Sequence, residues 1–348
     1  MTVVERRMPA EWERHEATWI AWPHNPDDWP GNFEAIPWVY GEIVRALSAA
    51  ERVEILCHDE AVEESARKVL GAHGVPADSY RLHRVPTDRS WLRDSAPTFV
   101  FSASGSAELL HWRFNAWAKY DNYRKDSLVP KAIEKIVDLP RVEPVRENGE
   151  RIVLEGGGIE VNGRGRLLVT EEWLLSDVQV RNPGMTRDEY ERAFANYLGT
   201  HEVIWLGEGA VGDDTHGHID DIARFASEDT VLLAFERDPA DENHRRSADN
   251  RRRLDLASKK NSMRVVELPY PRPVTMQGER LPASYANFYI ANGRVIVPTF
   301  NDPSDREALD IIAREFPNRA VVGIHCVDLV WGLGTLHCLT QQQPSPSK

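Results

Sequence analysis

Self-similarity at a spacing of roughly sixty residues constrains the fold of this chain more than any other feature of its sequence. Apolar, β-branched runs typical of strands end near Val85, Val145, Leu206, Leu268 and His325. An amphipathic stretch with helical spacing precedes each run. A second strand follows each run and opens with a motif, in order WLRDSAPTFVF, IVLEGGGIEV, DTHGHIDDIARF, ASYANFYIANG and GTLHCLTQ. Such a unit cannot bury its own faces, so the units are expected to pack around a shared axis.

The repeat predicts an α/β fold, namely a five-bladed α/β propeller of pseudo-fivefold repeated ββαβ modules. We expect residues 1–340 to form a single domain. Residues 341–348, QQQPSPSK, are expected to be a flexible tail because they are polar and rich in Pro and Ser. The segment ATWIAWP indicates one more strand, which would close the ring against the C-terminal module, and a helix is expected over residues 33–49.

Several predicted helices carry recognisable ends. Thr186 and Ser127 stand where an N-cap hydroxyl is expected, and Gly74 and Gly199 stand just past the last helical turn, where glycine is favoured.

Composition narrows the classes of partner. The formal net charge of −13 disfavours nucleic acid and anionic membranes and is compatible with a small cationic ligand. No apolar run approaches the length of a membrane span, and the first residues lack the pattern of a secretory leader. The cysteines, Cys57, Cys326 and Cys338, are too few and too scattered for a disulfide framework. These features predict a cytoplasmic protein.

The period places reactive side chains at equivalent points of four modules, namely Asp94, Glu155, His218 with Asp220, and Cys338. The remaining module offers Ser284, Tyr285 and Asn287 there. Cysteine is a nucleophile when a nearby cation or histidine stabilises its thiolate, and histidine transfers protons near neutral pH. Carboxylates beside a thiolate repel it unless a cation lies among them. The set therefore points to a positively charged substrate with an electrophilic carbon, which is a guanidinium.

The chain resembles the agmatine deiminase and bacterial-type peptidylarginine deiminase family, within the guanidine-modifying enzyme superfamily. The matching segments run in order from residue 11 to residue 344 and are EWERHEATWIAWP, WLRDSAPT, FNAW, LEGGGIEVNGRG, DDTHGHIDD, SYANFYIANG, PTFNDPSD and HCLTQQQP. Each motif alone is weak, and the ordered set is specific.

The resemblance implies a role for each matching residue. Cys338 corresponds to the nucleophile, His218 to the acid/base histidine and Glu155 to the carboxylate that orients it, while Asp94 and Asp220 correspond to the pair that binds the guanidinium. The implied reaction is thiol-dependent hydrolytic deimination without metal or cofactor, through a covalent thiouronium on Cys338. The implied fold is a five-bladed α/β propeller, and a homo-oligomer such as a dimer is expected.

The substrate is left open between agmatine, which gives N-carbamoylputrescine in polyamine synthesis, and peptidyl or free arginine, which gives citrulline. The absence of an export pattern favours agmatine. Trp22 and Trp117, together with Trp331, are candidates for an apolar wall around the substrate tail. Ala96, Leu333 and Thr335 depart from the family's usual motifs near the expected mouth, and these departures bear on substrate choice.

Two readings from other classes compete with deimination. The run HGHIDD, residues 216–221, is close to the ligand pattern of dinuclear metallohydrolases, although Asp221 stands where a histidine is expected. The other hypothesis is a propeller without activity that serves as a binding module. Against it stands the joint presence of five reactive residues, namely Cys338, His218, Glu155, Asp94 and Asp220.

Overall fold

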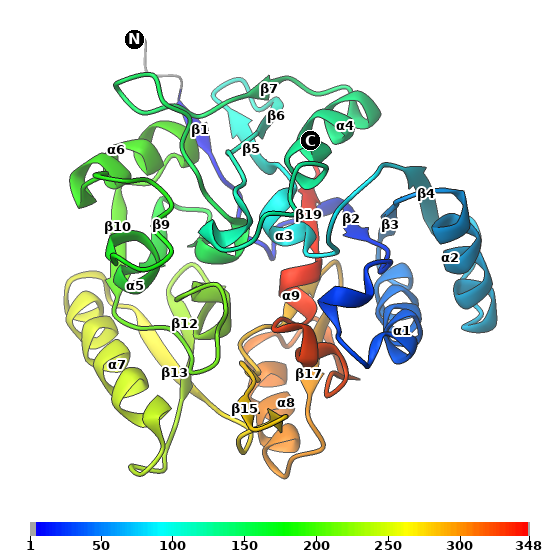
Figure 1. The fold of residues 1–348 in the computed structure, drawn as a ribbon. Helices are drawn as coiled ribbons and strands as arrows, with labels where there is room; N and C mark the ends of the chain where they lie inside the picture. Colours follow the sequence, from blue (N-terminus) through cyan, green and yellow to red (C-terminus); the bar gives the residue numbers. More distant parts are fainter. Residues whose placement is uncertain (1–4, 347–348) are drawn as a thin grey trace.

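The computed structural model describes residues 5–346, apart from the side chain of Asn261, and has a mixed α/β fold (Figure 1). The strands of the described residues form separate small sheets, and the larger helices lie on the outside of the molecule in the view of Figure 1. No helix in this part of the chain is long and apolar enough to cross a membrane.

Four sheets share one connectivity, in which an antiparallel pair of strands is followed by a helix and a third strand parallel to the second. Their strands are β5 (Thr98–Ser102), β6 (Ala107–Leu110) and β7 (Arg141–Val142); β8 (Glu160–Val161), β9 (Arg166–Thr170) and β10 (Glu202–Leu206); β11 (Ala223–Ser227), β12 (Thr230–Phe235) and β13 (Arg264–Pro269); and β16 (Tyr289–Ala291), β17 (Arg294–Thr299) and β18 (Ala320–His325). The intervening helices are α4 (Val129–Val137), α6 (Arg187–Leu198), α7 (Glu242–Asn261) and α8 (Ser304–Glu315).

A fifth sheet of the same connectivity joins the two ends of the chain. Strand β19 (Gln341–Pro344) pairs antiparallel with β2 (His15–Ala21), and β2 pairs parallel with β3 (Arg52–Cys57) after helix α1 (Ile36–Ser48). Helix α2 (Glu60–Ala72) and strand β4 (Tyr80–Arg84) extend this sheet. The predicted ββαβ repeat is confirmed at the level of strand pairing, as is the pairing of the N-terminal strand with the C-terminal module.

The prediction of a flexible tail over residues 341–348 is wrong for its first four residues, which form β19. Their polar side chains have buried partners: Trp19 Nε1 donates to Gln343 Oε1 at 2.9 Å, and Arg93 Nη1 donates to Gln342 Oε1 at 2.7 Å. A polar composition therefore indicated disorder where the amides are held by hydrogen bonds. Residues 347–348 lie outside the described residues.

The predicted helix ends are mostly confirmed. Thr186 and Glu189 form a reciprocal capping box at the start of α6, and Gly199 ends that helix at a φ of 73°. Gly74 has a φ of 66° after α2. Ser127 is not an N-cap, because its Oγ donates to the carbonyl of Arg124 in the turn that precedes α4.

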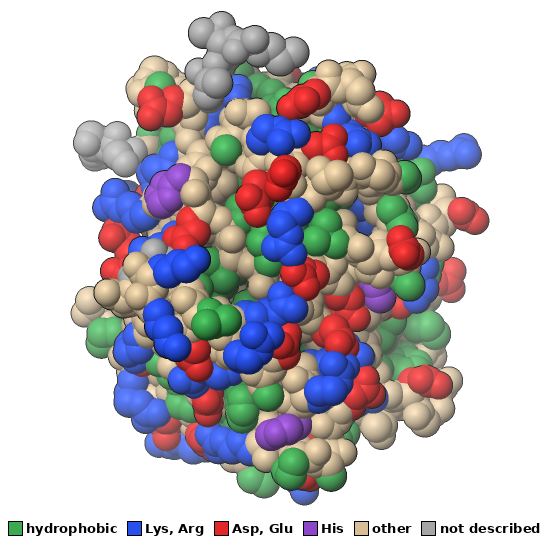
Figure 2. Space-filling model, turned by 90° about the vertical axis from the view of Figure 1, so that its left-hand side faces the viewer, with side chains coloured by type: hydrophobic (Ala, Val, Ile, Leu, Met, Phe, Trp, Pro, Cys, Tyr) green, Lys and Arg blue, Asp and Glu red, His purple; other side chains and the backbone are tan. Residues whose placement is uncertain are grey.

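Helix α7 is strongly basic, but its arginines are paired with carboxylates. Arg245 contacts Glu208 at 2.7 Å, Arg251 contacts Glu267 at 2.6 Å, and other arginines of the helix bond acidic residues one turn away. Figure 2, which views the side of the molecule that carries α7, shows basic and acidic side chains interspersed over this face. Such a surface lacks the single-sign patch typical of a nucleic-acid site.

The remaining strands and α-helices of the described residues are short. They are β1 (Arg6–Arg7), which pairs with β5; the β14 (Thr275–Met276) and β15 (Glu279–Arg280) hairpin; and the short helices α3 (Leu92–Ser95), α5 (Glu171–Leu175) and α9 (Leu336–Leu339).

Candidate active site

The reactive residues predicted from the repeat meet at one place, and all are buried. Asp94 lies on α3 and Cys338 on α9, while Glu155 and His218 immediately precede short 3-10 turns. His218 Nδ1 is 3.8 Å from Asp94 Oδ2, and His218 Nε2 is 3.6 Å from Glu155 Oε2. Cys338 Sγ is 3.8 Å from Asp220 Oδ2. Thiol, imidazole and three carboxylates thus share one buried centre.

Gly157 lets these groups approach one another. A Cβ at this position would lie 2.7 Å from His218 Nδ1 and 3.0 Å from both Asp94 Oδ1 and Asp220 Oδ2. Its N–H also donates to Asp94 Oδ1 at 2.9 Å. The middle glycine of the Glu-Gly-Gly-Gly motif is therefore required by close packing against the reactive side chains.

Glu155 and His218 form an ion pair, and two further side chains donate hydrogen bonds to the Glu155 carboxylate. Arg181 Nε donates to Glu155 Oε1 at 3.1 Å, and Trp173 Nε1 donates to Oε2 at 2.7 Å. Burial alone would raise the pKa of Glu155, but Arg181 and His218 outweigh it and lower that pKa to about 2. Burial would lower the pKa of His218, but Asp94 and Glu155 raise it to about 9. At neutral pH His218 is therefore an imidazolium that can donate a proton.

Asp94 and Asp220 offer carboxylate oxygens to a cation. Asp94 is oriented by the N–H of Gly157 and by Trp117 Nε1, which donates to Oδ2 at 2.7 Å. Asp220 Oδ2 is held by His337 Nδ1 at 2.7 Å, whereas Asp220 Oδ1 is buried and has no hydrogen-bond partner among the described residues. Because a buried carboxylate oxygen without a donor is costly, this atom is suited to accept from a bound guanidinium.

The Cys338 thiol is protonated in the free site. Burial raises its pKa well above the usual value, and the charges of Asp220, Asp221 and Asp94 raise it further. A guanidinium bound among these carboxylates would cancel their repulsion of the thiolate. The site is therefore arranged so that a cationic ligand promotes ionisation of its own nucleophile.

Asn287 supplies a hydrogen bond to the sulfur. Its Oδ1 accepts from Thr335 Oγ1 at 2.7 Å and from the N–H of His337 at 3.0 Å, which fixes the orientation of the amide. Its Nδ2 consequently faces Cys338 Sγ at 3.1 Å and Asp221 Oδ1 at 3.0 Å. Repeat analysis placed Asn287 at the mouth without a role, and this contact defines one.

Replacing Asn287 with Ala is expected to lower kcat/KM by about 10- to 100-fold, because a hydrogen bond to an ionised group contributes about 1.5–3 kcal/mol. The pKa of the Cys338 thiol should also rise further, which slows its alkylation by iodoacetamide at a fixed pH. Steady-state kinetics and alkylation rates measure both effects. Ser284→Ala is the matched control, since this buried serine of the same motif bonds the N–H of Ala286 and not the sulfur. Equal effects of the two substitutions would contradict the assignment.

A cavity of about 540 Å³ leads from solvent to Cys338 and Asp94. Trp117 and Trp331 line it, as expected, and Leu333 lies beside them with a φ of 67°. The expectation for Trp22 is wrong: this side chain is fully buried and packs edge-on against Tyr40, with ring centroids 5.8 Å apart. Trp22 directly follows β2 and faces helix α1 rather than the cavity.

The cavity lining is rich in carboxylates. Asp27, Asp28, Asp214 and Glu279 line it, and Arg89 is the cationic side chain among its lining residues. The Arg89 guanidinium is already engaged, because Nη1 donates to Asp28 Oδ1 at 2.9 Å and Nη2 donates to Asn122 Oδ1 at 2.9 Å.

The side chains that a dinuclear metal site would need from the HGHIDD run do not form one cluster among the described residues. His216 Nε2 hydrogen-bonds to Ser176 Oγ at 3.0 Å, and His218 is placed between Asp94 and Glu155. Within residues 5–346, the one group of three or more metal-type donors that all lie within 4.8 Å of one another is Asp220, Asp221 and Cys338, which includes neither histidine. His216 and His218 of the HGHIDD run therefore do not join Asp220 and Asp221 in one group of metal-type donors among the described residues.

Comparison with known proteins agrees with this geometry. The sequence model of the family described as Porphyromonas-type peptidyl-arginine deiminase matches residues 7–344. Agmatine deiminase from Ectopseudomonas mendocina is 35% identical over 364 residues, covering 97% of this chain and 95% of that protein.

Solved structures are similar along the same length. Agmatine deiminase of Enterococcus faecalis superposes with a TM-score of 0.89 at 29% identity, covering 99% of this chain and 97% of the other. A cysteine-to-serine variant of the C. jejuni agmatine deiminase, with substrate bound, superposes with a TM-score of 0.87 at 26% identity, with coverage of 99% and 97%. The chain belongs to the Porphyromonas-type peptidyl-arginine deiminase family.

Proposed function

We propose that this protein hydrolyses agmatine to N-carbamoylputrescine and ammonia, with Cys338 as nucleophile and no metal or organic cofactor. The observation that carries the choice of substrate is the carboxylate-rich lining of the cavity that leads to a site suited to a guanidinium. Agmatine has a cation at each end, so both ends meet carboxylates. The α-carboxylate of free arginine would instead meet the exposed Asp27 and Glu279, because Arg89 is already paired with Asp28 and Asp214 with Lys119. Similar proteins named agmatine deiminase support the same substrate.

The first half of the reaction forms a covalent intermediate. Asp94 and Asp220 bind the planar guanidinium by charge-assisted hydrogen bonds. The Cys338 thiol loses its proton to solvent as the cation binds, and the thiolate attacks the central carbon to form a C–S bond. The bond from that carbon to a terminal nitrogen breaks while His218 protonates the nitrogen, and ammonia leaves. A thiouronium remains on Cys338.

The second half returns the enzyme to its starting state. His218, now neutral, removes a proton from water, and the resulting hydroxide attacks the thiouronium carbon. The C–S bond breaks and its electron pair returns to sulfur. The proton of the added hydroxyl passes to the sulfur directly or through solvent and restores the thiol, and the ureido product leaves. Glu155 keeps the His218 imidazole oriented through both proton transfers.

We also infer that the five modules surround a common axis as a five-bladed α/β propeller forming one catalytic domain. The joining of both chain ends in one sheet supports this arrangement, since it gives the last module the same connectivity as the others. A homo-oligomer and a cytoplasmic location remain predictions.

The direct test incubates chelator-treated protein separately with agmatine, arginine and a blocked peptidyl-arginine, and measures ammonia and ureido product. Turnover of agmatine that is unaffected by chelator is the expected result. Turnover of only the arginine compounds would agree with the proposed reaction class and contradict the assignment of agmatine as the substrate. Activity that disappears with chelator would favour the metal reading.

Replacing Asp214 with Asn is expected to raise KM for agmatine by about two- to fivefold, the range for a partly exposed ion pair. Asp214 lines the cavity, accepts from Tyr120 Oη at 2.7 Å and pairs with Lys119, and we infer that its carboxylate lies near the amine end of the substrate. Butylguanidine, which has the same chain without the amine, provides the control substrate and should show no such change. A comparable rise in KM for both substrates would contradict recognition of the amine by this carboxylate.

A further inference from the structure

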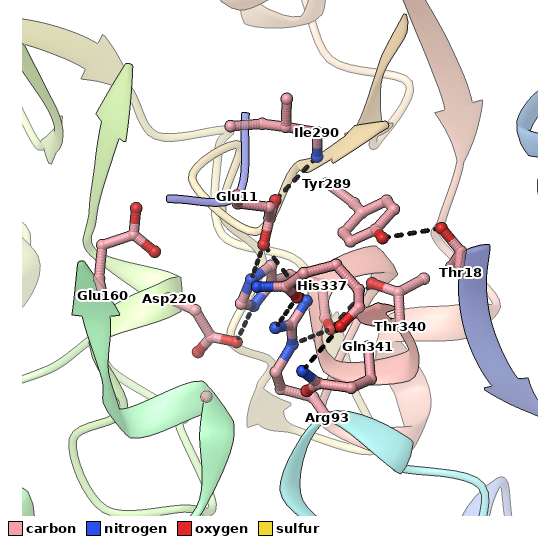
Figure 3. A network of polar contacts seen from close by, with 12 residues as sticks. Glu11, Thr18, Arg93, Glu160, Asp220, Tyr289, Ile290, His337, Thr340 and Gln341 are labelled. Atoms are coloured by element: carbon pink, nitrogen blue, oxygen red, sulfur yellow. Dashed lines mark hydrogen bonds and ion pairs between the residues drawn. The ribbon is translucent and has the colours of Figure 1, made fainter. Parts of the chain in front are cut away.

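His337, the residue before the nucleophile, lies between two carboxylates. Figure 3 shows its imidazole between Asp220 and Glu11, with Nδ1 at 2.7 Å from Asp220 Oδ2 and Nε2 at 2.8 Å from Glu11 Oε2. All three side chains are buried. Ionised carboxylates only accept hydrogen bonds, so an imidazole bonded to one through each nitrogen donates twice and carries a positive charge.

Glu11 is itself fixed by groups from distant parts of the chain. Its Oε1 accepts from Arg224 Nη2 at 2.9 Å and from the N–H of Ile290 at 2.8 Å. Arg93 Nη2 donates to Oε2 at 3.3 Å, and Arg93 Nε also donates to the carbonyl of His337 at 3.2 Å. The N-terminal segment thus supplies an anchored, buried acceptor behind His337 (Figure 3).

The charges around Asp220 show what His337 contributes. His337, His218 and Arg224 favour its ionised form, whereas burial opposes it. Burial, together with neighbouring charges that include Asp220, raises the pKa of Asp94 and of Asp221, and the Cys338 sulfur is 3.8 Å from Asp220. Burial alone would raise the pKa of Asp220, and His337 is the largest of the influences that lower it.

We propose that His337 is a positioning residue whose imidazolium, held by Glu11, fixes Asp220 as an oriented carboxylate with its free Oδ1 available to the guanidinium. The proposal rests on the proposed function, because it assigns Asp220 to substrate binding. It adds a residue that touches no reacting atom and acts through Asp220.

The test is the pH dependence of kcat/KM in His337→Asn, which removes the cation and keeps one donor. Asp220 should then take up a proton at higher pH. In the plot of kcat/KM against pH, the acid limb, which is the fall in kcat/KM on the acidic side, should therefore move to higher pH by about one pH unit or more. At pH 7, kcat/KM should fall by about 100-fold through misplacement of the guanidinium. Glu11→Gln, which removes the second carboxylate and keeps a hydrogen bond, should shift the acid limb in the same direction by a smaller amount.

His15→Asn is the matched control. His15 is equally buried and bonds the Glu51 carboxylate at 3.1 Å, but it reaches Glu11 only through a main-chain carbonyl and does not contact Asp220. It should lower the melting temperature and leave the acid limb in place.

The outcomes separate this proposal from the proposed function. If the wild-type protein turns over no guanidine compound, the proposed function itself is rejected. An active wild type whose acid limb is unmoved in folded His337→Asn and in Glu11→Gln overturns the positioning role. If His337→Asn does not fold, the pH profile of Glu11→Gln alone tests the proposal. An acid limb of kcat/KM at the same pH as in the wild type would then reject it.

Discussion

Replacing Cys338 with Ser is expected to lower kcat for agmatine by about 10⁴-fold or more, and His218→Asn is expected to do the same. Without the thiol no thiouronium forms, and without the imidazolium ammonia has no proton donor. Because both residues serve the same covalent cycle, the double variant should lose little more than either single variant. Single-turnover and steady-state assays of product measure these losses.

Cys326→Ala is the control for general effects of removing a buried thiol. Cys326 follows strand β18 and is fully buried in the core, away from the carboxylates of the site. This variant should keep kcat and lose only stability. Substantial turnover by Cys338→Ser, in a preparation free of wild-type protein, would rule out the nucleophile assigned here.

Replacing Asp94 with Asn is expected to slow the turnover of agmatine and to speed the alkylation of Cys338. Turnover of agmatine should fall by about 100- to 1,000-fold, since truncating one partner of a buried charge pair costs about 2–5 kcal/mol. The new amide would also direct N–H groups at the Trp117 indole N–H or the Gly157 amide, which now donate to this carboxylate. Steady-state kinetics at saturating and limiting agmatine measure the loss.

Alkylation of free Cys338 should become faster in the same variant. The charge of Asp94 helps to raise the pKa of the thiol, so removing it lowers that pKa and increases the thiolate fraction at pH 8. Asp28→Asn provides the comparison, because it removes a buried carboxylate that lines the cavity and pairs with Arg89 rather than facing the sulfur. Slower or unchanged alkylation in Asp94→Asn would show that this carboxylate does not control the thiol.

The sequence predicted the repeat and the reactive residues because each module repeats one strand pattern and presents one motif at the same point. The positions of Asp94, Glu155, His218 and Cys338 follow from that period. It could not predict what lies behind them: Glu11 contacts His337 across 326 positions, and Arg181 contacts Glu155 from a loop outside the repeated motifs. Such contacts depend on how the modules face one another, which local patterns do not encode.

Two sequence expectations failed for related physical reasons. The Gln-rich end of the chain was polar, and polarity alone does not reveal that Trp19 and Arg93 bond its amides within a sheet. Trp22 was placed at the substrate because large aromatics often line pockets, but the strand that precedes it turns its side chain toward α1. Arg93, the neighbour of Asp94 in the sequence, pairs instead with Glu11 at 3.3 Å.

The central claim is that catalysis passes through a covalent bond to Cys338, and acid-quenched mass spectrometry of the protein during turnover of agmatine tests it most directly. The peptide that contains Cys338 should carry a mass increase equal to agmatine less ammonia, and the adduct should decay as substrate is exhausted. The same peptide from Cys338→Ser should stay unmodified and that variant should release no product. Sustained turnover with no adduct on Cys338, together with product from Cys338→Ser, would contradict the mechanism.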